Sequence, residues 1–104
     1  MAEKKWYETA EDKIQRLHEQ ADEAAFVEFV KLSDIGKDNG DEAGQIIGLL
    51  NAAAIACKMG NYDLCAAVLD NAFNVNEEMS TEYLQTQPRM YEMMKTLSDA
   101  GKFG

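Results

Sequence analysis

The sequence contains a single proline in 104 residues and few runs of β-branched residues. Proline interrupts helices and β-branched side chains favour strands, so the scarcity of both favours helices. A chain of this length is expected to form one domain with a single, modest hydrophobic core. We therefore predict an all-α fold for residues 1–104, organised as a small bundle of four to five helices.

Long apolar runs are also missing. No stretch of apolar residues reaches the length of about 20 that a membrane-spanning helix needs. Residues 1–13 lack the apolar core of a signal peptide. From these two absences we expect a cytoplasmic protein without a membrane partner.

Histidine and cysteine are rare: His18 is the only histidine, and Cys57 and Cys65 are the only cysteines. These three residues do not have metal-ligand spacing, and no cofactor motif or nucleophile motif is present. The sequence therefore predicts no metal, no cofactor, no catalytic residue and no enzymatic activity. Both cysteines fall on inward-facing helical positions, which predicts buried thiols, with a redox pair between facing helices as the alternative.

Lysine and arginine are absent from residues 59–88, and the whole chain has a formal net charge of −9. A negative chain is repelled by nucleic acid and by anionic membranes, so neither is expected as a direct partner. Asp63, Asp70 and Glu77 recur every seven residues, nearly two helical turns, and Glu78 follows. The three are predicted to form one stripe on the outer face of a helix. The stripe is either a solvated face or a docking surface for a basic partner protein.

The most informative stretch is residues 46–78, where two apolar, helix-periodic segments are separated by Gly60 and Asn61. Gly60 can adopt the left-handed conformation that ends the first helix, and Asn61 can cap the second. So short a connection forces the two helices to lie antiparallel. Residues 42–78 are therefore predicted to form a helical hairpin, whose alanine-rich first helix is covered on more than one side.

Small and bulky residues alternate along this hairpin around a Gly-Asn-Tyr turn. They are Leu49, Ala52, Ala53, Ala56, Gly60, Asn61, Tyr62, Cys65, Leu69, Ala72 and Phe73. With this pattern the hairpin resembles a tetratricopeptide repeat. It departs from the family's pattern at Leu49, Ala56 and Cys65, and Glu77 stands where the family has its closing proline. Residues 87–103 resemble the first half of a second repeat.

The remaining segments are assigned from helix and turn signals. Residues 1–8 form an N-terminal arm, and residues 9–35 form one helix or two, with a break near Asp22 and Glu23. Residues 33–44 are rich in glycine, aspartate and asparagine and form the clearest predicted loop. Because the helices predicted on either side extend into this segment, the linker itself is assigned to residues 36–41. The loop ends at Asp41, the N-cap of the next helix. Residues 79–87 are a predicted connection, and residues 88–100 a C-terminal helix that starts near Pro88.

Two kinds of candidate partner-binding residues follow from these assignments. The acidic ones are Asp63, Asp70, Glu77 and Glu78. The apolar ones are Trp6, which either packs on the first helix or anchors a partner, and Met90, Met94 and Phe103, which would form a self-association or partner patch if exposed.

Three functions remain open. The resemblance implies an interaction module or adaptor, which holds a peptide or helix of a partner protein in a groove between helices. The charge suggests an acidic inhibitor or nucleic-acid mimic that covers a basic surface. A structural subunit that forms a homodimer is the third. High salt should weaken an acidic mimic steeply and a groove-binding module little.

Overall fold

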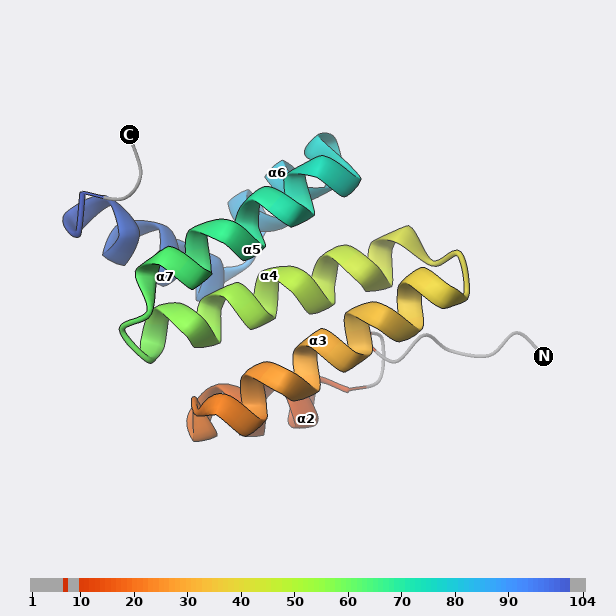
Figure 1. The fold of residues 1–104 in the computed structure, drawn as a ribbon, viewed down its shortest axis with the longest axis horizontal. Helices are drawn as coiled ribbons and strands as arrows, with labels where there is room; N and C mark the ends of the chain where they lie inside the picture. The colour runs from red at the N-terminus through yellow and green to blue at the C-terminus, as the bar shows by residue number, and fades with distance from the viewer. Residues whose placement is uncertain (1–6, 8–9, 102–104) are drawn as a thin grey trace.

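The computed structural model describes Tyr7 and residues 10–101, and the regular structure among them is entirely helical. The described residues form six α-helices that pack antiparallel into one compact unit (Figure 1): α2 Glu11–Gln20, α3 Glu23–Asp38, α4 Glu42–Lys58, α5 Tyr62–Val75, α6 Glu77–Thr86 and α7 Pro88–Asp99. The predicted all-α class is confirmed. The predicted number of four to five helices is wrong, because α6 occupies a segment that was expected to be a connection.

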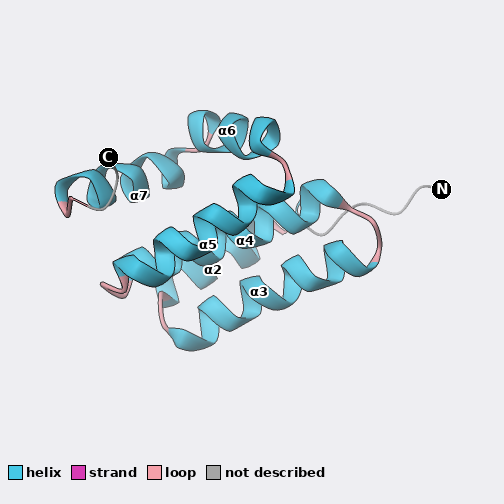
Figure 2. Cartoon of the chain, turned by 45° about the horizontal axis from the view of Figure 1, so that its top comes forward, coloured by secondary structure: helices cyan, strands magenta, loops and turns pink. Residues whose placement is uncertain are grey.

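Helix α4 forms the centre of the fold. It lies between α3 and α5 (Figure 1), and α6 and α7 lie on the other side of the α4 and α5 pair from α3 (Figure 2). Every residue from 50 to 57 is buried. A helix that is apolar nearly all round must be covered on several sides, and its alanines let the neighbouring helices come close. The predicted covering of this helix on more than one side is confirmed.

The turn between α4 and α5 has the predicted geometry. Gly60 has a φ of 80°, in the left-handed region, and the Asn61 side chain accepts a hydrogen bond of 3.2 Å from the Leu64 backbone N–H. The turn between α3 and α4 is built in the same way from Gly40, with a φ of 68°, and Asp41, which caps α4. Helices α3, α4 and α5 are therefore two consecutive antiparallel hairpins with the same type of turn.

The predicted loop at 33–44, with its linker at 36–41, is wrong: α3 continues to Asp38 and only residues 39–41 connect it to α4. Gly40 forms the short turn, whereas Gly36, and Gly48 in the following helix, serve close helix packing. A Cβ atom on Gly36 would lie 2.6 Å from the Gln45 backbone nitrogen, and one on Gly48 would lie 2.7 Å from the Ser33 backbone nitrogen. Only glycine allows α3 and α4 to approach this closely.

Of the two arrangements predicted for residues 9–35, one helix or two, the structure has two helices. Helix α2 ends at Gln20, Ala21 has a left-handed φ of 46°, and the Asp22 side chain caps α3 by accepting a 2.9 Å hydrogen bond from the Ala25 N–H. The break therefore falls at residues 21 and 22, as the shift in the apolar face predicts. Capping by Asp22 satisfies an N–H that the first turn of α3 would leave without a partner.

The predicted connection at 79–87 is wrong as well, because this segment belongs to α6. Asn76 ends α5 in an extended conformation, with a φ of −162°, and caps α6 by accepting a 3.0 Å hydrogen bond from the Met79 N–H. Ser80 is buried, and its hydroxyl donates to the Ala72 carbonyl at 2.9 Å. Polar residues that suggest a connection thus form a cap and a contact between helices.

Candidate functional site

The predicted acidic stripe does not lie on one helix. Asp63 and Asp70 are exposed on α5, whereas Glu77 and Glu78 are exposed in the first turn of α6. The extended Asn76 separates the two helices, so the seven-residue spacing does not continue to Glu77. The four carboxylates are surface residues on two adjoining helices.

The predicted apolar patch of Met90, Met94 and Phe103 also differs from the prediction. Met90 is fully buried, because it belongs with Met93 and Leu97 to the face of α7 that packs into the core. The interpretation of Met90 as an exposed partner residue is therefore wrong. Met94 is half-buried against the core cluster. Trp6 and Phe103 lie outside the described residues.

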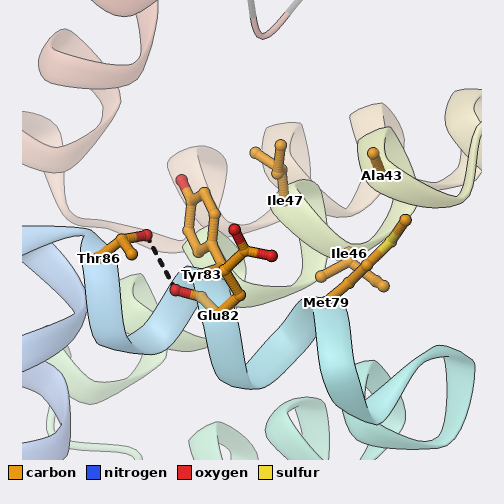
Figure 3. Close-up of a pocket in the computed structure, with 7 residues that line it drawn as sticks. All are labelled: Ala43, Ile46, Ile47, Met79, Glu82, Tyr83 and Thr86. Carbon is orange, nitrogen blue, oxygen red and sulfur yellow. Dashed lines mark hydrogen bonds between the residues drawn. The ribbon is translucent and has the colours of Figure 1, made fainter.

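A different surface has the shape of a binding site. A hollow of about 270 Å³ opens between α4 and α6, and we call it the α4/α6 groove. Figure 3 shows its lining residues: Ala43, Ile46, Ile47, Met79, Glu82, Tyr83 and Thr86. Its surface is mostly apolar, Ile46 is buried beneath it, and Met79 is 40% exposed. The volume lies below the range of about 300 to 1,000 Å³ that is usual for small-molecule pockets, and it suits one or two protein side chains.

One wall of the groove is held by a buried hydrogen-bond network. The Asn51 side chain donates from Nδ2 to the Tyr83 hydroxyl at 3.0 Å and to the Ile47 carbonyl at 2.8 Å. Its Oδ1 lies 2.7 Å from Nε2 of His18. Asn51 is fully buried and His18 nearly so. Asn51 therefore connects α2 and α6 through the central helix and fixes the position of the Tyr83 ring.

This network determines the protonation state of His18. A backbone carbonyl can only accept, so Nδ2 of Asn51 faces Ile47 and Oδ1 faces the histidine. Nε2 of His18 must then carry the proton. The ammonium group of Lys58 lies 3.2 Å from Nδ1, so it donates to that nitrogen when the ring is neutral. The geometry thus requires the neutral ring with the proton on Nε2.

The surroundings of the ring favour the same neutral form. Burial lowers the pKa of His18 to about 4; the Asn51 hydrogen bond opposes this shift, and the positive charges of Lys58 and Arg89 add to it. Burial also raises the pKa of Tyr83, which keeps its hydroxyl neutral. The network is therefore made of uncharged groups, apart from Lys58 at one end.

We expect the Asn51→Leu variant to be less stable by roughly 1 to 2 kcal/mol, although leucine has a similar size and is apolar. The substitution leaves the buried Nε2 proton of His18 without an acceptor and removes the donor to the half-buried Tyr83 hydroxyl. Urea denaturation at pH 7 measures this loss. A conservative control is Asn71→Leu at an exposed position of α5, which should change stability by less than about 0.5 kcal/mol. Equal stability of the two variants would contradict a structural role for the network.

The described residues offer few candidates for thiol chemistry, for metal binding or for a membrane-spanning helix. Cys57 and Cys65 are free, buried thiols, and burial raises the pKa of both, that of Cys65 to about 12. Within residue 7 and residues 10–101, no group of three or more His, Cys, Asp or Glu side chains is placed to hold a metal ion. No helix in that part of the chain is both long and apolar enough to cross a membrane.

The groove could not be predicted as long as residues 79–87 were assigned to a connection, because one of its two walls is the helix α6. The signal was present in the spacing of Met79, Tyr83 and Thr86, which follow one another at four and three residues along one helical face. Of the two adjacent isoleucines that line the groove, Ile46 is buried and Ile47 is half-buried. The network of His18, Asn51 and Tyr83 joins residues more than 30 positions apart, so no local sequence pattern predicts it.

Comparison of the chain with family models, with curated proteins and with solved structures finds no match. The function therefore has to be argued from the groove and its surroundings.

Proposed function

We propose that this protein is a non-enzymatic interaction module that holds an apolar side chain of a partner protein in the α4/α6 groove. The observation that carries this proposal is the mostly apolar lining of the groove, with Met79 exposed at its edge. Methionine is common at protein-binding surfaces because its flexible side chain adapts to different partners. An exposed apolar hollow in a soluble domain is a typical site of such contacts.

The hairpin of α4 and α5 supports the same proposal by analogy. Its Gly60 turn and alternating small and bulky residues resemble a tetratricopeptide repeat, and helical surfaces of such repeats bind segments of other proteins. The groove uses α4 of this hairpin together with the flanking helix α6. Fold analogy alone does not establish a function, so the test has to address the groove directly.

Site-specific photo-cross-linking provides that test. A photoreactive amino acid replaces Met79, and the matched control places it at Asn71, which is exposed on α5 and does not line the groove. In extract of the source cell, the Met79 position should cross-link to one partner segment, identified by mass spectrometry. Adding Ile47→Glu, a half-buried wall residue, should abolish that product while the melting temperature changes by only a few degrees.

The other outcomes discriminate between the functions. Equal products from the Met79 and Asn71 positions would contradict the groove. A product lost only in high salt would favour the acidic inhibitor or mimic. A product that consists of two copies of this chain would favour the structural homodimer.

A further inference from the structure

The charged side chains that α6 carries beside the groove are all acidic. Glu82 lines the α4/α6 groove and also lines an adjoining hollow on α6, together with Glu77, Glu78, Thr81 and Gln85. No lysine or arginine occurs in residues 59–88, so α5 and α6 carry no positive side chain. In the part of the chain that the structure describes, the ion pairs join Lys13 to Glu28 and Arg89 to Glu11. The carboxylates of α6 are therefore not neutralised by these pairs.

The two hollows adjoin along α6. Met79 and Tyr83 face the apolar groove, and Glu78 is the residue before Met79, on the side of the acidic hollow. Glu82 belongs to both. A bound segment whose apolar side chain fills the groove therefore places its neighbouring side chains over these carboxylates.

We propose that the partner segment carries a large apolar side chain flanked by lysine or arginine. The apolar side chain lies between Ile47, Met79 and Tyr83, and the basic side chain pairs with Glu82 and Glu78. This inference rests on the proposed function and adds the chemical class of the partner. Apolar burial supplies most of the affinity, whereas exposed ion pairs add little each and instead select the partner and speed its approach.

The test uses three 12-residue peptides that differ only in composition. The first places leucines three and four residues apart, on one helical face, with lysines at the positions beside them. The second replaces each lysine by glutamate, and the third replaces each leucine by serine. Fluorescence anisotropy with the full-length protein measures the affinity of each at low and at high salt. The leucine and lysine peptide should bind, the leucine and glutamate peptide should bind at least tenfold more weakly, and the serine and lysine peptide should not bind.

A pair of double variants assigns the charge effect to these residues. Glu78→Gln with Glu82→Gln should weaken binding of the leucine and lysine peptide about three- to tenfold. The matched control, Asp34→Asn with Asp70→Asn, removes the same number of exposed carboxylates from α3 and α5, away from the groove, and should change the affinity less than twofold. Equal weakening by both would show an effect of net charge and would overturn the proposal.

The peptides also separate this inference from the function on which it rests. If the leucine peptides bind equally well with lysine or with glutamate, binding in the α4/α6 groove is supported and the selection of a basic partner is rejected. If the serine and lysine peptide binds as tightly as the leucine and lysine peptide, the acidic surface acts without the groove and both proposals fail. If no peptide binds, the basic partner class is rejected, and the cross-linking at Met79 decides the groove independently.

Discussion

Replacing Gly48 by alanine is expected to lower the free energy of unfolding by about 2 kcal/mol. In an ordinary helix this change would be stabilising by about 1 kcal/mol, because alanine is the better helix former. Here the added Cβ would lie 2.7 Å from the Ser33 backbone nitrogen and 2.9 Å from the Phe29 carbonyl oxygen. Backbone atoms of a packed helix cannot move aside singly, so α3 and α4 must separate, at a cost of about 3 kcal/mol for overpacking.

The same substitution one turn earlier provides the control. A Cβ on Gly44 would meet side-chain atoms of Asp41 and Tyr7, with the closest contact, 2.6 Å, to an Asp41 carboxylate oxygen. That carboxylate can rotate away, but the rotation gives up its capping hydrogen bond to the Gly44 N–H, at a cost of about 1 kcal/mol. Alanine is the better helix former by about 1 kcal/mol, so the two effects offset each other and Gly44→Ala should be close to neutral. Urea denaturation of both variants measures the difference. A Gly48→Ala protein as stable as the wild type would contradict the close contact between α3 and α4.

Lowering the pH from 7 to 4 is expected to destabilise the protein by about 3 kcal/mol through His18 alone. The pKa of this residue is 6.5 in the unfolded chain and about 4 in the fold, where burial and the Lys58 and Arg89 charges oppose protonation. Above pH 6.5 the ring is neutral in both states, and its contribution is fully present. As the pH falls from 6.5 to 4, only the unfolded chain binds the proton, so stability is lost across this window.

The His18→Gln variant isolates this effect. Glutamine can still donate to Asn51 but does not titrate, so the variant should be less stable at pH 7 and lose less stability on acidification. The other acid-sensitive groups are common to both proteins and cancel in the comparison. Denaturation curves at several pH values measure the difference. Parallel loss of stability in the two proteins would show that His18 is not the acid-sensitive group.

Local signals were sufficient at the ends of helices. Gly60 and Asn61 mark the turn between α4 and α5, Pro88 marks the first turn of α7, and the phase shift near Asp22 marks the break after α2. In each case the local conformation satisfies backbone groups at a helix end, and sequence neighbours are enough to decide it.

Local signals failed where the same residue types serve contacts between helices. Gly36 and Ser33 suggest a loop, but both are buried in the contact between α3 and α4. Ser80 suggests a connection, but its hydroxyl bonds to the end of α5. The sequence alone does not distinguish a glycine in a turn from a glycine at a close helix contact. Only the position of the neighbouring helix distinguishes them.

The candidate site was harder to predict than the fold, for the same reason. The acidic character of the region was evident from the missing lysine and arginine, but the stripe through Glu77 depended on α5 continuing past Val75. The groove requires α6 to be a helix and to lie beside α4. The burial of Met90 can be predicted only when it is known which face of α7 meets the core. Each of these is a property of packing between segments far apart in the sequence.

Asn76 has a consequence for the thermodynamics of binding. It ends α5, caps α6 and donates a hydrogen bond to the Glu42 carboxylate at the start of α4, so one residue joins the three helices around the groove without a flexible linker. A binding surface fixed in this way loses little conformational entropy when it is occupied. The ordering cost then falls almost entirely on the partner segment, and a segment that is already helical when free should bind more tightly than a flexible one of the same composition.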